Sequence, residues 1–332
     1  MASATSPPSS EGVLDEIQHA RYRVGEPRGE QLGASQTIAT LREQGEVDGV
    51  FACTRKDRQL SRAGTPYLTV ELGDPTGTIL ARAFNDADLL AGRFERGDLV
   101  RVRGRVERYR ERLQVNIATI ARAEHEQADP ADFLPSAYRD LDELEGFLEH
   151  LAGEVYEEPL RLLLGSLLAD KRLRAEVRRA PCSIPGQRAS HHAYLGGLLE
   201  HTVGVATLAH ELCVLHPRLD RDLLLCAAIV HDLGKTREFS YGAEIARSAE
   251  GRMLGHVELG LRTIAPHIPG TLSGERRLAL EHCVLMHHGP DSAGGARFAS
   301  AEALALHRVN ALDAQVKGAF EQGLGAPASS GV

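Results

Sequence analysis

The sequence predicts two domains, a small five-stranded β-barrel followed by an all-α helical bundle. Three observations predict them. Short β-branched segments separated by turn residues fill residues 47–120, and leucines at helical spacing begin at Leu141. The stretch between them contains Pro130 and Pro135 and shows no period. Because side chains repeat every two residues along a strand and every 3.6 along a helix, the change of period marks a domain boundary.

We place the domain boundaries where residue composition and periodicity change. The opening is rich in Ser, Pro and Ala, and the end is rich in Gly, Ala and Ser. Such segments bury too little apolar surface to offset the entropy of ordering. We expect a weakly ordered segment over residues 1–45, the barrel over 46–124, a linker over 125–140, the helical domain over 141–322 and a disordered tail over 323–332.

Composition narrows the class of protein. With 42% hydrophobic and 25% charged residues, the 332-residue chain has the composition of an ordinary globular protein. A net charge of −8 argues against coating nucleic acid with the whole surface, though not against one basic face. The five cysteines form no C-x-x-C pair, and no apolar run approaches the ~20 residues of a membrane span. We expect a cytoplasmic protein without a membrane partner.

Five segments of β-branched or alternating residues predict the strands: 47–54, 67–72, 76–84, 99–106 and 112–120. Residues 85–92 read as one short helix, capped by Asn85 or Asp86 and ended by Gly92. Five strands with a helix between the third and the fourth match the Greek-key barrel called the OB fold.

The fourth strand places positive charge on one face, because Arg101, Arg103 and Arg105 alternate with smaller or apolar residues. Phosphate attraction beside stacking aromatic rings is how OB folds hold single-stranded nucleic acid. The candidate aromatic residues are Tyr67, Phe84 and Tyr109. Two plainer interpretations stay open, a solvated strand face for the arginines and core packing for each aromatic.

Twelve of the fifteen histidines lie between His191 and His307, and this is where chemistry is expected. His231 and Asp232 follow the apolar run of residues 223–230. Adjacent helical residues point about 100° apart, so the pair can share one metal ion only if other segments add ligands. His201 on an earlier helix and Asp313 beside the apolar stripe of the last helix are the candidates. A single histidine of this kind is more often a core or surface residue.

The order His, His-Asp, Asp resembles the HD superfamily of metal-dependent phosphohydrolases, whose fold is a helical bundle. The resemblance implies that His201, His231, Asp232 and Asp313 are metal ligands. In members with two metals, a later histidine and one from a His pair complete a second site, and the Asp of the His-Asp pair bridges. His256 fits the first of these positions, and either His287 or His288 fits the second.

Lys235 lies three residues beyond Asp232, near the same helix face, and is a candidate contact for a phosphate oxygen. The alternative is a surface lysine at a helix end. We expect Asp232 and Lys235 to be the residues closest to catalysis.

A closer resemblance is to the YhaM-type 3′-5′ exoribonucleases, which join an OB domain to an HD domain. It extends from about Val47 to Ala319 and is most specific in residues 191–202, 231–238, 251–256, 286–289 and 312–314. It implies removal of nucleoside 5′-monophosphates from the 3′ end of single-stranded RNA, with DNA as an alternative substrate. Homo-oligomerisation is left open.

The expected chemistry is hydrolysis by water that two divalent ions activate. An imidazole-rich ligand set favours Mn²⁺, which the resemblance also implies, with Fe²⁺ and Mg²⁺ as alternatives. Two other functions stay open: an HD phosphohydrolase acting on small or cyclic nucleotides, and a non-catalytic protein that binds single-stranded nucleic acid. The sequence contains no Walker P-loop, Rossmann glycine fingerprint or Gly-x-Ser-x-Gly elbow.

Overall fold

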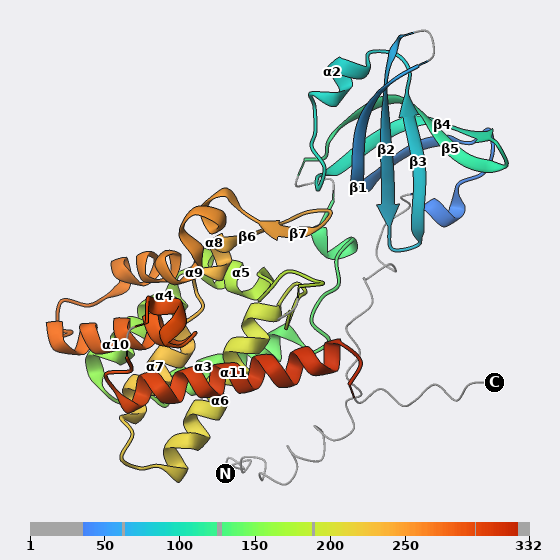
Figure 1. Ribbon diagram of the computed structural model, residues 1–332. Helices are drawn as coiled ribbons and strands as arrows, with labels where there is room; N and C mark the ends of the chain where they lie inside the picture. The colour runs from blue at the N-terminus through green and yellow to red at the C-terminus, as the bar shows by residue number, and fades with distance from the viewer. Residues whose placement is uncertain (1–35, 62–63, 125–127, 188–189, 296, 325–332) are drawn as a thin grey trace, which may run out of the picture.

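The computed structural model describes residues 36–61, 64–124, 128–187, 190–295 and 297–324. A closed β-barrel and a larger helical domain make up the molecule (Figure 1). Most of the expected weakly ordered opening and nearly all of the expected tail lie outside the described residues. Residues 36–45, which we expected to be weakly ordered, have a defined structure. The backbone of Ile38 donates to Asp74 Oδ2 over 2.6 Å, and Leu41 is buried in the barrel core.

The barrel is the predicted OB fold. Its strands are β1 (Glu46–Leu60), β2 (Pro66–Asp74), β3 (Gly77–Ala83), β4 (Leu99–Tyr109) and β5 (Arg112–Arg122), closed in the order β1-β2-β3-β5-β4. Phe51, Leu68 and Leu72 are among its fully buried core residues. The short helix α2 (Ala87–Ala91) packs Leu90 against this core and ends at Gly92 as expected. Asp86 occupies the N-cap position, as one of the two predicted residues, but its side chain accepts no hydrogen bond from the helix.

The helical domain is built around two buried helices, α6 (Gly197–Leu215) and α7 (Arg221–Val230). The others are α3 (Leu141–Gly153), α4 (Glu158–Ala169), α5 (Lys171–Arg179), α8 (Lys235–Glu238), α9 (Ala249–Ile264), α10 (Gly274–Met286) and α11 (Ala301–Glu321). From Leu223 to Val230 every residue of α7 is buried, which accounts for the continuous apolar run in the sequence. Aspartate or serine side chains accept from the first turns of many of these helices; these residues are Asp140, Asp170, Asp220, Ser248, Ser273 and Ser300.

The structure adds elements to those predicted from periodicity. Helix α5 is mostly charged, and only Leu173 and Val177 of its nine residues are buried. Helix α9 is broken at Gly255, whose φ is +70°, so its apolar pattern is interrupted. Between α8 and α9 lies a hairpin of β6 (Phe239–Tyr241) and β7 (Ile245–Arg247). These segments are too short or too irregular for a periodic pattern to emerge.

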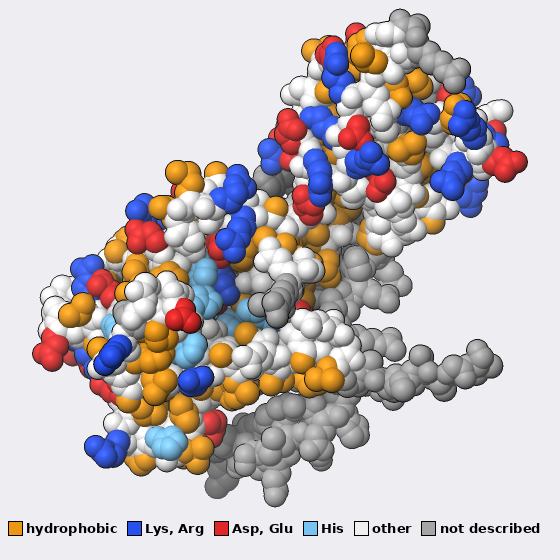
Figure 2. Space-filling model, viewed as in Figure 1, with side chains coloured by type: hydrophobic (Ala, Val, Ile, Leu, Met, Phe, Trp, Pro, Cys, Tyr) orange, Lys and Arg blue, Asp and Glu red, His pale blue; other side chains and the backbone are white. Residues whose placement is uncertain are grey.

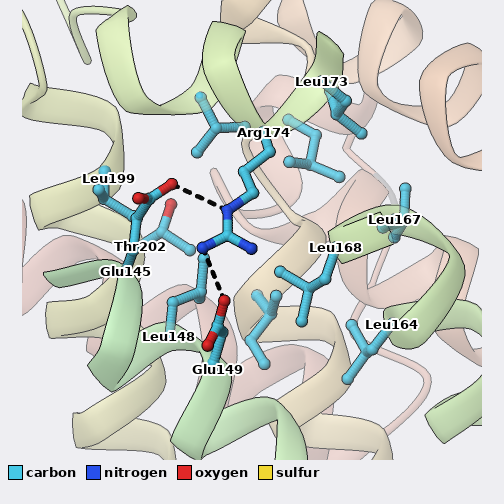
Figure 3. A pocket seen from close by; sticks show the side chains of 13 residues that line it. Glu145, Leu148, Glu149, Leu164, Leu167, Leu168, Leu173, Arg174, Leu199 and Thr202 are labelled. Carbon is cyan, nitrogen blue, oxygen red and sulfur yellow. Dashed lines mark hydrogen bonds and ion pairs between the residues drawn. The ribbon is translucent and has the colours of Figure 1, made fainter. Parts of the chain in front are cut away.

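Helix α6 is long and apolar enough to cross a membrane, and among the described residues it is the one helix that is. It is a core helix here, since 56% of that stretch is buried inside the domain. The side of α6 that faces α3, α4 and α5 borders a small apolar pocket, which leucines of those three helices line (Figure 3). Arg174 lies at this pocket, 3.0 Å from Glu145 and 2.6 Å from Glu149. Leu199 and Thr202 line it too, so the helix that carries His201 rests on packed apolar side chains.

Candidate metal centre and nucleic-acid interface

The helical fold brings the predicted metal-binding histidines together. His201 comes from the buried side of α6, while His231 and Asp232 follow directly after α7. His256 follows the break in α9, and His287 ends α10. Gly234 permits this assembly, because a Cβ there would lie 1.9 Å from the carbonyl oxygen of His256. Histidine side chains gather in a depression of the helical domain (Figure 2).

Asp232 lies between two groups of imidazoles and is only 1% exposed. Its Oδ2 atom is 3.4 Å from His201 Nε2 and 3.3 Å from His231 Nε2. Its Oδ1 atom is 3.6 Å from His256 Nε2 and 3.5 Å from His287 Nε2. One carboxylate therefore presents a different oxygen to each group, as a residue that bridges two ions would.

His288 belongs to the second group. It is exposed, and its Nε2 lies 2.8 Å from Nε2 of His256. One ligand atom from each of Asp232, His256, His287 and His288 lies within 4.8 Å of the others, and the same holds for His201, His231 and Asp232. Both histidines of the pair at 287 and 288 thus point to the same place, whereas the sequence pattern required only one.

In four of these histidines the other ring nitrogen, Nδ1, contacts an oxygen atom on the side of the ring that faces away from Asp232. His231 Nδ1 donates to the carbonyl of Ala228 over 2.8 Å, and His287 Nδ1 donates to the carbonyl of Val284 over 2.5 Å. His201 Nδ1 lies 2.6 Å from Asp313 Oδ2, and His256 Nδ1 lies 3.1 Å from Glu238 Oε2. We assign the proton to Nδ1 in each ring from these partners. All four Nε2 atoms are left facing Asp232, the arrangement that orients metal-binding histidines.

Asp313 lies differently from the expectation. Its Oδ2 contacts the ring nitrogen of His201 that faces away from Asp232, and it is 3.0 Å from Nε2 of His192. As these side chains lie, Asp313 orients His201 and does not join Asp232 in the cluster. Nothing in the local sequence around Asp313 distinguishes the two roles, because they differ only in the ring nitrogen that is contacted. Its role as a direct ligand stays a prediction.

Lys235 is buried, so it is not a surface lysine. Its Nζ lies 2.7 Å from Asp232 Oδ2 and 3.2 Å from the Cys182 thiol. Burial opposes the charge, but Asp232 and Cys182 raise the pKa of Lys235, which therefore stays protonated. In this position it neutralises the central carboxylate, and its predicted contact with a phosphate stays a prediction.

The central groups fit a divalent cation. Although Lys235 is close, neither oxygen of Asp232 accepts a well-aligned hydrogen bond from the described residues. Burial alone would raise the pKa of Asp232, but Lys235 and His231 hold it well below its usual value. Burial lowers the pKa of His287 to about 4, so this ring is neutral and can donate a lone pair. A buried, ionised carboxylate with unused acceptor capacity, beside the neutral imidazole of His287, is a set of donors suited to a metal.

His201 differs from His287 in its protonation state. Burial opposes its charge, but Cys182, Asp232 and Asp313 together raise the pKa of His201 to about 10. Binding a metal through this ring requires loss of a proton at neutral pH.

On the barrel, the predicted arginines are already paired with other residues. Arg101 and Arg103 lie 2.8 and 3.1 Å from the two oxygens of Asp48, and Arg105 donates to the carbonyl of Gln44 over 3.2 Å. Together with Arg93, which sequence reasoning missed, Arg101 and Arg103 line an open hollow on the barrel surface.

The aromatic candidates lie elsewhere, so the structure divides the expected groove into two surfaces. In the closed strand order β4 neighbours β5 and β1, whereas Tyr67 and Phe84 stack at the paired ends of β2 and β3 with ring centroids 5.7 Å apart. Phe84 is 47% exposed and so is not a core residue. Only Tyr109, from the tip of β4, reaches this side, where the Arg82 guanidinium lies 5.3 Å from its ring. Alternation within one strand could not reveal which strands are neighbours.

Two polar atoms on this aromatic side lack partners. The Oγ1 atom of Thr69 and the Nε atom of Arg82 are buried and have no hydrogen-bond partner in the described part of the chain. Arg82 does donate to Gln114 over 3.1 Å through another nitrogen. Sequence reasoning missed Thr69 and Arg82, since neither belongs to a motif. Glu238 was also missed, although it ends the segment 231–238 that carried the resemblance.

The domains match known families. The HD domain model matches residues 198–315, and the OB-fold nucleic acid binding domain model matches residues 45–121. The fold and the cluster around Asp232 thus define an HD-domain protein with a candidate divalent-metal site, joined to an OB-fold domain.

Similarity to whole proteins narrows this class. The 3′-5′ exoribonuclease YhaM of Shouchella clausii is 31% identical to this chain, over 81% of the chain and 84% of the relative. The protein of that name from Bacillus subtilis is 29% identical, over 83% and 87%. The chain belongs to the YhaM 3′-5′ exoribonuclease family. A solved replication protein A domain from Methanococcus maripaludis covers 27% of this chain and 96% of its own length, with 18% identity and a TM-score of 0.24.

Proposed function

We propose that the protein is a metal-dependent 3′-5′ exoribonuclease that hydrolyses single-stranded RNA, and single-stranded DNA as a second substrate, to nucleoside 5′-monophosphates. Family membership supports the reaction. The observation that supports the chemistry is the position of Asp232, whose two oxygens face two separate histidine groups.

His201, His231 and Asp232 would hold one ion, and Asp232, His256, His287 and His288 would hold a second. Bound ions supply an activated water and neutralise charge that develops on the phosphoryl group. The imidazole-rich donors favour Mn²⁺, with Fe²⁺ or Mg²⁺ as alternatives. The protein's part is to keep Asp232 ionised through Lys235 and to present His288 at the exposed side of the cluster.

For the nucleic-acid interface we favour the aromatic side of the barrel. The Tyr67 and Phe84 rings offer a stacking platform for bases, and Arg82 beside Tyr109 adds a cation. The unpartnered Arg82 Nε can donate a hydrogen bond to a bound strand, and Thr69 Oγ1 can donate or accept one. Arg101, Arg103 and Arg105 would contribute attraction to phosphates at longer range. A cytoplasmic location agrees with the five cysteines, all unpaired and buried.

The test is digestion of end-labelled single-stranded RNA and DNA under Mn²⁺. We expect a ladder that shortens from the 3′ end and yields 5′-monophosphates, and no products after chelation. Turnover of mononucleotides or cyclic dinucleotides with RNA left intact would favour the small-nucleotide alternative. Binding without any Mn²⁺-dependent product would favour the non-catalytic alternative.

A further inference from the structure

The hairpin β6–β7 extends from the end of α8 toward the barrel (Figure 1). At its tip the backbone N–H of Ala243 donates to the carbonyl of Gly97 over 3.0 Å, and Glu244 Oε2 lies 3.3 Å from Arg96 Nη2. Gly97 and Arg96 belong to the barrel loop that precedes β4. These two contacts connect the hairpin to the barrel, while Ile245 of β7 packs against Leu134 of the segment that joins the two domains.

At its base the hairpin begins at Glu238, whose side chain is 4% exposed and whose Oε2 lies 3.1 Å from His256 Nδ1. The carbonyl of Glu238 accepts the N–H of Ser248 over 2.9 Å, so the base is closed. Gly251 packs directly on this carbonyl, because a Cβ there would lie 2.2 Å from it. The backbone of Glu238 is therefore held at a fixed place relative to α9, from which its carboxylate reaches His256.

His256 needs such a partner more than His231 and His287 do. It follows Gly255, where α9 leaves helical geometry. The rings of His231 and His287 are fixed by carbonyls of their own helices, three residues earlier in each case. The ring of His256 is oriented by a carboxylate from a different element. The other neighbour of Glu238, Arg247, is 3.8 Å away and cannot hold it as tightly.

We propose that Glu238 is a positioning residue that aims His256 Nε2 at Asp232, and that the hairpin transmits the docking of the barrel to this contact. The proposal rests on the proposed metal site and deepens it by naming a regulatory connection. A barrel held against the hairpin tip stabilises the ion on the His256 side, and a displaced barrel weakens it. The His201 side lacks any such connection in the described chain, since Asp313 orients His201 from α11.

The first experiment titrates Mn²⁺ into the metal-free full-length protein and follows free Mn²⁺ by its electron paramagnetic resonance signal. Two classes of site are expected in the unmodified protein. Glu238→Ala should weaken one class by about tenfold or more, the usual effect of losing a carboxylate behind a ligating histidine. Glu238→Gln should restore part of the loss, because its amide oxygen still accepts from Nδ1.

Glu250→Gln is the matched control. Glu250 also links α8 to α9, through Arg237 at 2.9 Å, but touches no histidine of the cluster. Both site classes should stay unchanged in this variant. An equal loss in Glu250→Gln and Glu238→Gln would overturn the proposal, because it would indicate a structural effect.

His256→Ala separates the two levels of inference. If this substitution leaves both site classes intact, the proposed metal site fails. If it weakens one class while Glu238→Ala weakens none, the metal site stands and the positioning role is wrong.

The second experiment tests the transmission. Arg96→Glu places like charges at the hairpin tip and should weaken the same site class at least about twofold. Arg112→Glu makes the same charge change where β5 begins, at the opposite end of β4 from the loop of Arg96, and should have no effect. In the Glu238→Ala background Arg96→Glu should do nothing further. Independent, additive losses would refute the connection through Glu238.

Discussion

The arginine face of the barrel and the histidine cluster of the helical domain both gather ionisable side chains, yet they differ in how well those groups are satisfied. The Arg101 and Arg103 side chains are 41% and 62% exposed, and both contact Asp48. Asp232 is 1% exposed, and beside its ion pair with Lys235 it accepts no well-aligned hydrogen bond from the described residues. Exposed charges with partners need no ligand, whereas a buried carboxylate with unused acceptor capacity can bind a further cation. For this reason we propose that the chemistry takes place at the histidine cluster and not on the arginine face.

The largest effect is expected at the centre of the cluster. Asp232→Asn removes the charge shared by both histidine groups, and Mn²⁺-dependent hydrolysis should fall roughly 10³-fold or more. Digestion of labelled RNA under saturating Mn²⁺ measures it. Because Lys235 would be left without its partner, circular dichroism must show that the variant is folded. Undiminished activity in a folded variant would end the catalytic assignment.

On the barrel, the aromatic side should matter more than the arginine face. Phe84→Ala removes one ring of the stacked pair, and stacking contributes about 1–3 kcal/mol per base, so affinity for single-stranded RNA should fall roughly 5- to 150-fold. Fluorescence anisotropy with catalysis blocked by chelation measures it. Leu89→Ala, which also truncates an exposed apolar side chain, is the control. Equal affinities for the two variants would remove the aromatic side from the interface.

A smaller effect is expected from the arginines. Arg103→Gln should reduce affinity less than about tenfold and lower the salt slope by less than 1, because Asp48 already neutralises part of the charge. Asp48→Asn should act in the opposite direction and raise affinity by releasing Arg101 and Arg103. A rise in the first variant, or a fall in the second, would contradict the assignment of these arginines to phosphate attraction.

The smallest effect concerns an ion pair of the helical domain that resembles the barrel's surface pairs. Arg276 bonds to Asp220, 2.9 Å away through one nitrogen, and lowers the pKa of Asp220. A carboxyl with a lowered folded-state pKa stabilises the fold above its unfolded pKa of about 3.9, and that stability is lost as the pH falls through the lower value. The side chain is 38% exposed, so solvent screening keeps the contribution near 1 kcal/mol or less.

Urea denaturation of the unmodified protein and of Arg276→Gln between pH 2 and pH 7 checks this. The difference in free energy of unfolding should shrink toward acid pH. A difference that grows there would reverse the assigned sign.

The sequence predicts well what local periodicity and residue order encode. Alternation located five strands, and the order of His201, His231, Asp232 and the later histidines located the cluster. The sequence could not predict that Asp313 contacts Nδ1 of His201 and not Nε2, because this choice depends on a side-chain torsion. Nor could it predict that Tyr67 and Arg103 lie on different sides of the barrel, since closure order is a long-range property. Glu238 lies between a short helix and a hairpin, whose few residues leave no periodic signal.

The close approach of Gly234 to α9 has one more consequence. A Cβ at this position would lie 1.9 Å from the carbonyl of His256 and 2.4 Å from the backbone nitrogen of Gly260. The segment that carries Asp232 therefore touches the segment that carries His256 main chain to main chain. The distance between these two main-chain segments is thus set by backbone contact and does not depend on the side chain at position 256. A different donor could be substituted at position 256 to alter the proposed metal preference without changing this main-chain distance.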